Sequence, residues 1–144
     1  MTNVEYMEMA YDLHQRIDSK IEILSSLRQT GCAVTQILTG MPHSPNRGHS
    51  KLESTAVKII DMENEINDDI DKLVDLKKEM YSVINRLKKS KHKTVLEQRY
   101  LCFREWDDIA VSMHYNKRYI YKLRDQALDA LEIPDWAKET DVQV

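Results

Sequence analysis

Basic and aromatic side chains are concentrated in one stretch of the 144-residue chain, WDDIAVSMHYNKRYIYKLRDQALDAL at residues 106–131. Apolar residues recur there at helical spacing in two groups. The first group is Trp106, Ile109, Ala110 and Met113, and the second is Ile120, Leu123, Ala127, Leu128 and Leu131. If the second group faces a core, helical geometry directs the polar residues between its members toward solvent. Those residues are Lys117, Arg118, Tyr121, Lys122 and Asp125. Such a face can bind phosphates and the edges of nucleotide bases.

The polar step SMHYN between the two groups predicts the turn of a helix-turn-helix. Asn116 is a good N-cap residue, and His114 and Tyr115 supply the turn. The small residue Ala110 lets the two helices cross closely. In a helix-turn-helix the N-terminal part of the second helix enters the major groove of DNA. We therefore predict a recognition helix over residues 116–131.

The candidate DNA-binding residues follow from this placement. On the recognition helix they are Asn116, Lys117, Arg118, Tyr121, Lys122 and Arg124. Lys89 and Lys91 precede the helix-turn-helix in the sequence, and in the functional interpretation they contact phosphates beside the groove without reading base sequence. The same functional interpretation applies to Lys88 and Lys93, and a solvated helix end explains all four lysines equally well.

The net charge of −3 is distributed unevenly along the chain. Residues 1–85 hold 9 basic and 14 acidic side chains, residues 86–126 hold 11 and 5, and residues 127–144 hold 1 and 5. A basic segment that overlaps the predicted helix-turn-helix is typical of a protein that binds a polyanion.

The sequence gives no sign of an enzyme or of a bound cofactor. It contains no phosphate loop, nucleophile motif or dinucleotide fingerprint. Cys32, His43 and His49 have no recognised metal-ligand spacing, so we expect no metal site. Acidic pairs such as Asp68 and Asp69 are expected on the solvent face of a long helix, where they favour solubility.

The residues before the basic segment predict two long helices. Thr2 to Glu5 has the form of a capping box, and an apolar stripe follows it until Gly31, a plausible stop. The stripe consists of Tyr6, Ala10, Leu13, Ile17, Ile21, Leu24 and Leu27. Glycine and proline residues between 30 and 50 predict a long loop, and a second capping box, Ser50 to Glu53, predicts the start of the next helix.

The second helix carries a coiled-coil seam. Its positions are Ala56, Ile59, Glu63, Ile66, Ile70, Leu73, Lys77, Met80, Ile84 and Leu87. A parallel dimer in register would place like charges together at Glu63 and at Lys77, so we favour an antiparallel hairpin with the first helix. Dimers that exchange helices stay open, as does a homo-oligomer through these helices.

These patterns define an all-α protein in three parts. A helical hairpin or coiled coil occupies residues 1–89, the helix-turn-helix residues 90–133, and a tail residues 134–144. Ser90 or Thr94 is expected to cap the first helix of the second part, Thr94 together with Glu97.

The segment LEQRYLCFREWDDIAVSMHYNKRYIYKLRDQALDAL, residues 96–131, resembles region 4 of bacterial sigma factors, which binds a promoter element. The resemblance departs where that family starts its recognition helix with Ser/Thr-Arg-Glu-Arg, because here Arg118 replaces the acidic residue, which implies a different target sequence. Nothing resembles the other sigma regions, so a complete sigma factor is not expected. With its N-terminal helices the whole chain is similar to ArpU-type transcriptional regulators of phages and prophages.

The resemblance implies a sequence-specific regulator that activates late genes, binds double-stranded DNA and contacts RNA polymerase. Two alternatives stay open: a helical adaptor or anti-sigma-like protein that binds polymerase without touching DNA, and a small terminase subunit. No apolar run approaches the roughly 18 residues that a membrane span requires, and the first ten residues do not resemble a signal peptide. We therefore expect no membrane partner and a cytoplasmic location in the bacterial host cell.

Overall fold

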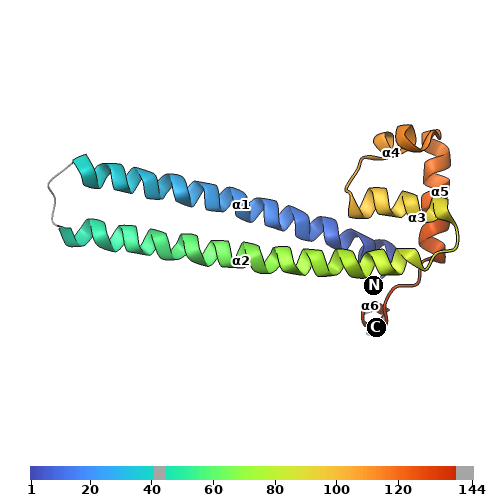
Figure 1. Cartoon of the computed structure of the whole chain (residues 1–144), viewed down its shortest axis with the longest axis horizontal. Helices are drawn as coiled ribbons and strands as arrows, with labels where there is room; N and C mark the ends of the chain where they lie inside the picture. Colours follow the sequence, from blue (N-terminus) through green and yellow to red (C-terminus); the bar gives the residue numbers. More distant parts are fainter. Residues whose placement is uncertain (41–44, 139–144) are drawn as a thin grey trace. The chain divides into compact units, whose positions relative to one another are not determined.

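The computed structural model describes the backbone of residues 1–40 and 45–138, and the side chains of residues 1–33 and 51–138. Helices make up nearly all of this part of the chain, which contains no strand (Figure 1). The elements are α1 (Asn3–Gly40), α2 (Pro45–Asn85), α3 (Ser90–Leu96), the π-helical turn η1 (Glu97–Leu101), α4 (Trp106–Met113), α5 (Lys117–Ala130) and α6 (Asp135–Lys138). The predicted all-α class, with a helical hairpin before a helix-turn-helix, is confirmed.

The chain forms two compact units. Unit 1 combines Met1–Leu13 with Leu73–Val144, and unit 2 is His14–Lys72. Each long helix therefore contributes one end to unit 1 and its remainder to unit 2. The division into segments at residues 89 and 133 stays a prediction about the order of motifs along the chain.

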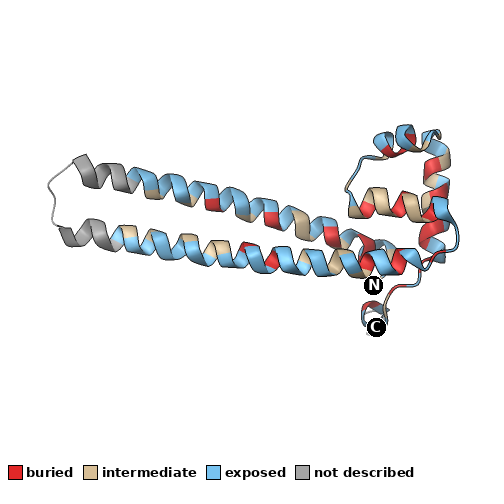
Figure 2. Cartoon of the chain, viewed as in Figure 1, coloured by how far each residue is buried: buried red, intermediate tan, exposed pale blue. Residues whose placement is uncertain are grey.

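Unit 2 is a pair of antiparallel helical segments with a narrow apolar stripe (Figures 1 and 2). Ile17, Leu24 and Ile66 are buried in it. The Lys20 ammonium donates to the carboxylate of Asp69, which is also buried, and this hydrogen bond holds the pKa of Asp69 below its ordinary value. The expectation that Asp69 lies on the solvent face is therefore wrong.

Three apolar residues of the expected stripes are exposed in unit 2, one of them Ala56. Ile21 is 45% exposed and Ile70 is 40% exposed. A layer of only two helices covers a narrow strip of each, so residues at the margin of a helical stripe stay in contact with water. Asp69, which precedes Ile70 in the sequence, lies on the buried side of the helix and pairs with Lys20.

The expected loop over residues 30–50 is largely helical, because α1 continues to Gly40 and α2 begins at Pro45. Gly31 does not end a helix, and a Cβ at this glycine would lie 3.5 Å from Thr55 Cγ2. This is an ordinary van der Waals distance, so alanine would fit at this position and would remove the roughly 1 kcal/mol that glycine costs inside a helix. Proline suits the first position of a helix because its missing N–H has no partner there anyway. The side chain of Ser50, part of the expected second capping box, lies outside the described residues.

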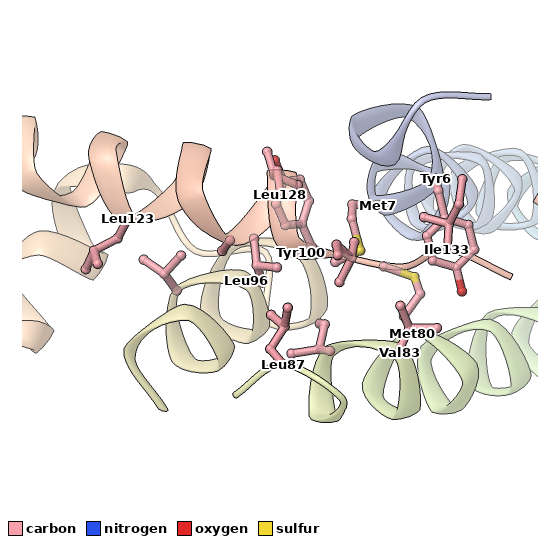
Figure 3. Close-up of a cluster of buried hydrophobic side chains, with 14 of the residues drawn as sticks. Tyr6, Met7, Met80, Val83, Leu87, Leu96, Tyr100, Leu123, Leu128 and Ile133 are labelled. Atoms are coloured by element: carbon pink, nitrogen blue, oxygen red, sulfur yellow. The ribbon is translucent and has the colours of Figure 1, made fainter. Parts of the chain in front are cut away.

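Unit 1 has one hydrophobic core, which joins the helix-turn-helix to the ends of both long helices (Figure 3). From α1 it includes Tyr6, Met7 and Ala10, all fully buried. From α2 and the residue pair after it, it includes Met80, Val83, Ile84 and Leu87. The remainder comes from residues 95–137, among them Val95, Leu96, Tyr100, Ile109, Ile120, Leu123, Ala127 and Leu128.

Hydrogen bonds tie the start of α1 into unit 1. The Thr2 to Glu5 capping box is confirmed, since Glu5 N–H donates to Thr2 Oγ1 and Thr2 N–H donates to Glu5 Oε2, both at 3.1 Å. Asn3 Nδ2 donates to the carbonyls of Leu128 and Leu131, at 2.7 and 2.9 Å. The Leu128 carbonyl lies in the last turn of α5 and the Leu131 carbonyl at its C-cap, where a helix leaves carbonyls without the usual helical partner.

The carboxylate of Glu79 links Tyr6 of α1 to Trp136 of α6 in unit 1. Tyr6 Oη and Trp136 Nε1 both donate to Glu79 Oε1, at 2.8 and 3.0 Å. Burial and the hydrogen bond to Glu79 raise the pKa of Tyr6. Trp136 docks onto the unit through an edge contact with Tyr6, with ring centroids 5.8 Å apart.

A short turn over residues 86–89 connects α2 to α3. Leu87 lies buried in this turn and donates its N–H to the Ile84 carbonyl at 3.0 Å. The expectation that Ser90 or Thr94 caps the following helix is wrong. Lys89 occupies the N-cap position without a side-chain hydrogen bond, and Thr94 lies within α3 and donates to the Ser90 carbonyl. A buried Val95 and Leu96 instead fix where α3 packs.

Candidate nucleic-acid interface

The local geometry of α4, the turn and α5 is that of the predicted helix-turn-helix. His114 has a left-handed backbone, φ 61°, and ends α4. Tyr115 N–H then donates to the Ala110 carbonyl at 3.1 Å. Asn116 caps α5, since its Oδ1 accepts from Tyr119 N–H at 2.8 Å. A left-handed residue therefore ends α4, and a capping side chain starts α5.

The buried faces of α4 and α5 pack the helix-turn-helix into the core of unit 1. Ile109 and Ala110 of α4 are buried, and so are Ile120, Leu123, Ala127 and Leu128 of α5. The apolar pattern in the sequence predicted these positions. The polar face of α5 is therefore directed away from the core.

The outer face of α5 changes sign along the helix. Arg118 and Lys122, in the first two turns, are exposed and form no ion pair with any residue that the structure describes. Asp125 and Asp129 follow on the same face in the later turns. Together with Asn116, Tyr119, Tyr121 and Gln126, these residues line a shallow surface groove. Positive charge is thus concentrated at the N-terminal half of α5.

Lys117 and Asn116 are already engaged within unit 1. Lys117 Nζ lies 2.7 Å from Asp107 Oδ1, and this hydrogen bond raises the pKa of the lysine. Both side chains are more than half exposed, so the pair is a weak surface contact that a phosphate can displace. The oxygen of Asn116 serves as the cap.

Lys91 lies beside the turn of the helix-turn-helix. Its ammonium is 5.2 Å from the centroid of the Tyr115 ring, and Tyr115 in turn packs edge-on against Tyr119 at 4.7 Å. The two tyrosine hydroxyls raise the pKa of Lys91, the larger effect coming from Tyr115. Through this aromatic pair the structure joins Lys91 to the N-terminal half of α5. Lys91, Asn116, Arg118 and Lys122 thus belong to one surface, named here the basic surface.

Tyr121 and Arg124 pack against Trp106. The Tyr121 ring meets the Trp106 ring edge-on at 5.6 Å, and the Arg124 guanidinium lies 4.8 Å from the Tyr121 centroid and 5.5 Å from that of Trp106. Arg124 also forms a 2.9 Å ion pair with Asp125. Arg99 approaches Trp106 as well, at 5.0 Å. These contacts hold Arg124 against α4, apart from the basic surface.

Lys89 lies at the opposite end of α5 from Lys117. It lines a pocket with Ala130, the last residue of α5, and Glu132, which lies after the helix. A helix of 14 residues is about 20 Å long, so Lys89 and the N-terminal half of α5 face different regions of unit 1. The same pocket includes Lys88, for which the sequence also allows a phosphate contact, and Arg86 and His92, which were not predicted as site residues. The run of basic residues over 86–93 is the sequence feature that could have indicated this pocket.

Comparison with known families assigns the chain to one of them. A family model described as "Protein of unknown function (DUF1492)" matches residues 46–132, which is more than half of the chain. The chain therefore belongs to this family, which is found in phage proteins. The match extends from α2 to the residues after α5, so it contains the whole helix-turn-helix. No curated protein and no solved structure matches the chain.

The described residues contain no group of histidine, cysteine, aspartate and glutamate side chains that could hold a metal ion. No helix in this part of the chain is long and apolar enough to span a membrane.

Proposed function

We propose that this member of the family is a sequence-specific transcriptional regulator that binds double-stranded DNA. In this proposal it is an ArpU-type activator of phage or prophage late genes, acting in the cytoplasm of the host bacterium, and the N-terminal half of α5 enters the major groove. The observation that carries the proposal is the pair Arg118 and Lys122, exposed on the first two turns of a capped helix that follows a helix-turn-helix turn.

The distribution of charge on α5 supports insertion of its N-terminal end first. Arg118 can donate two parallel hydrogen bonds to guanine O6 and N7, the commonest specific contact in the major groove. Asp125 and Asp129 would face phosphates if the whole helix lay along the groove, and like charges repel. An α5 that enters end-on keeps both carboxylates away from the DNA backbone.

Lys91 and Lys117 suit contacts with the sugar-phosphate backbone. Both ammonium groups are held near the start of α5 by neighbours within unit 1. Contacts of this kind fix the position of a protein on DNA without reading its sequence. Arg124 and Tyr121 have a different role in this proposal, because they hold α4 and α5 together through Trp106.

Unit 2 supplies the surface for assembly in this proposal. Apolar side chains between 40% and 56% exposed lie on both of its helices. They are Ile21, Ile23, Val57, Ile60 and Ile70. A second copy of the chain or RNA polymerase would cover them, and the oligomeric state in solution together with co-purification of polymerase separates these two partners.

A two-step binding experiment tests the DNA proposal. Duplexes that bind are first selected from a random pool, and fluorescence anisotropy then measures affinity at several salt concentrations. Arg118→Ala should weaken binding to the selected duplex by about 1–3 kcal/mol and relax the preference at one base pair. Lys91→Ala should weaken binding to all duplexes alike and reduce the salt slope by about 0.9.

The matched control is Lys78→Ala, which removes one exposed lysine from α2 outside the basic surface. It should change neither the affinity nor the preference. If no duplex is enriched, or if Arg118→Ala and Lys78→Ala behave alike, the proposal is refuted. An adaptor that binds polymerase without touching DNA would give that result.

A further inference from the structure

A second basic site lies in unit 1, at the end of α5 that is opposite the basic surface. It is a pocket of about 510 Å³ between the turn that follows α2, the start of α3 and the residues after α5. Its lining residues are Val83, Arg86, Leu87, Lys88, Lys89, His92, Ala130 and Glu132. This volume is within the range of small-ligand sites in proteins, roughly 300–1,000 Å³.

The pocket combines an apolar floor with a cationic rim. Val83 and Leu87 are buried in the core of unit 1, where Figure 3 shows them side by side on α2 and in the turn that follows it. Arg86, Lys88 and Lys89 are exposed and form no ion pair with any described residue. The short turn produces this arrangement, since it buries Leu87 while its neighbours in the sequence reach solvent.

Glu132 is the single carboxylate among the residues that line the pocket. Three permanent positive charges therefore face one negative charge. The chain as a whole is acidic, with a net charge of −3, so this excess is a local property of the pocket. Such an excess attracts anions and favours those with more than one negative charge.

His92 adds a positioned ring nitrogen to the pocket. The ring is buried, and its Nε2 lies 3.2 Å from Gln126 Oε1. Since an amide oxygen only accepts, Nε2 must carry the hydrogen, and Nδ1 is the nitrogen left for a second partner. This nitrogen can pair with a phosphate oxygen, and the hydrogen bond to Gln126 holds the orientation of the ring.

We propose that this pocket binds a phosphate group. An arginine supplies a planar pair of donors that matches two phosphate oxygens, and two lysines supply mobile positive charges beside it. The pocket is larger than a single phosphate, so it accommodates a diphosphate or a phosphate that is part of a larger molecule. The group comes either from a free phosphorylated ligand or from the DNA backbone, and both sources share this chemistry.

Isothermal titration of the full chain with inorganic pyrophosphate, in the absence of DNA, tests the proposal. We expect binding at one site. The variant Arg86→Gln/Lys88→Gln/Lys89→Gln should bind at least about tenfold more weakly, because it loses three charge-assisted contacts. Glu132→Gln should bind several-fold more tightly, because it removes the opposing charge.

The control variant changes three exposed lysines of unit 2 in the same way. It is Lys51→Gln/Lys58→Gln/Lys72→Gln, which alters the net charge by the same amount. Its affinity for pyrophosphate should equal that of the unchanged chain. If both triple variants lose affinity equally, or if neither does, the pocket is not a phosphate site and the proposal is overturned.

A DNA arm identifies the source of the phosphate. If DNA supplies it, pyrophosphate competes with the duplex and the pocket variant lowers the salt slope by about 0.9 for each lost contact. If a free ligand supplies it, the duplex and pyrophosphate bind independently. Both results support the pocket. Since the pyrophosphate arm contains no DNA, its failure is distinct from failure of the proposed function at α5.

Discussion

Deletion of residues 1–13 should unfold the helix-turn-helix, although it removes none of the residues of α4 or α5. Tyr6 and Met7 are fully buried in the core that the helix-turn-helix shares. Burial of two side chains of this size contributes about 3–6 kcal/mol. The deletion also removes the two hydrogen bonds from Asn3 to the end of α5 and the one from Tyr6 to Glu79.

Three such hydrogen bonds add about 1.5–4.5 kcal/mol, so the loss amounts to about 5–10 kcal/mol. This is comparable to the whole stability of a typical domain, about 5–15 kcal/mol. We therefore expect unit 1 to lose its fixed packing in the deleted chain. Residues 14–72 all remain, so helical signal from unit 2 should persist.

Trp106 is a suitable reporter for this experiment because it belongs to α4 and packs against Tyr121 and Arg124 of α5. The chain has two tryptophans, so the background substitution Trp136→Phe leaves Trp106 as the only one. Thermal unfolding is then followed by near-ultraviolet circular dichroism and by fluorescence, with and without residues 1–13. The point variants Met7→Ala and Met7→Leu provide a graded control, with expected costs of about 2–5 kcal/mol and under about 1.5 kcal/mol. A cooperative Trp106 transition at an unchanged temperature in the deleted chain would refute the reasoning.

Three further predictions concern single contacts. Asn116→Ala should destabilise unit 1 by about 1 kcal/mol in urea unfolding, because α5 loses its cap, whereas Asn116→Asp should retain most of the stability. Lys20→Met should cost up to about 3 kcal/mol by leaving a buried carboxylate unpaired, and adding Asp69→Leu should recover much of it in a double-mutant cycle. Because the pKa of Asp69 is lowered in the folded chain, its pairing stabilises at neutral pH and is lost as the pH falls through the folded pKa, so Asp69→Asn should flatten the dependence of Tm on acid pH. Asp107→Asn should tighten DNA binding and steepen the salt slope by freeing the lysine that it holds, whereas Asp108→Asn, an equal change of charge at the next residue, should have a smaller effect.

Much of the helix-turn-helix could be predicted from sequence because its determinants are local. The spacing of Ile120, Leu123 and Ala127 defines the buried face of α5, and Asn116 marks its start. Each of these signals acts within four residues of the position that it specifies. The outward placement of Arg118 follows from the same periodicity.

The helix ends and the polar contacts could not be predicted in this way. Gly31 is a typical stop residue, yet α1 continues past it to Gly40, and a single glycine opposes this by only about 1 kcal/mol. Arg124 has the spacing of a surface residue, yet the ring of Trp106 holds it against α4. The sequence of α5 alone does not show this tertiary contact.

The same limitation applies to Asp69, whose partner Lys20 is 49 residues away in the sequence. A heptad pattern predicts which hydrophobic positions are buried. It does not predict that a charged residue is buried because a residue of another helix neutralises it. Pairing of this kind depends on the register between the two helices, which the sequence of either helix alone does not determine.

The bond from Asn3 to the carbonyl of Leu131 spans 128 residues. Since a ribosome adds residues in order, the core of unit 1 cannot close until its last helices have been synthesised, whereas the pairing in unit 2 requires only the first 72 residues. A polypeptide released early would therefore retain the paired helices of unit 2 without a folded unit 1. Under the proposed function, such a fragment would keep the assembly surface and lack the DNA-binding surface.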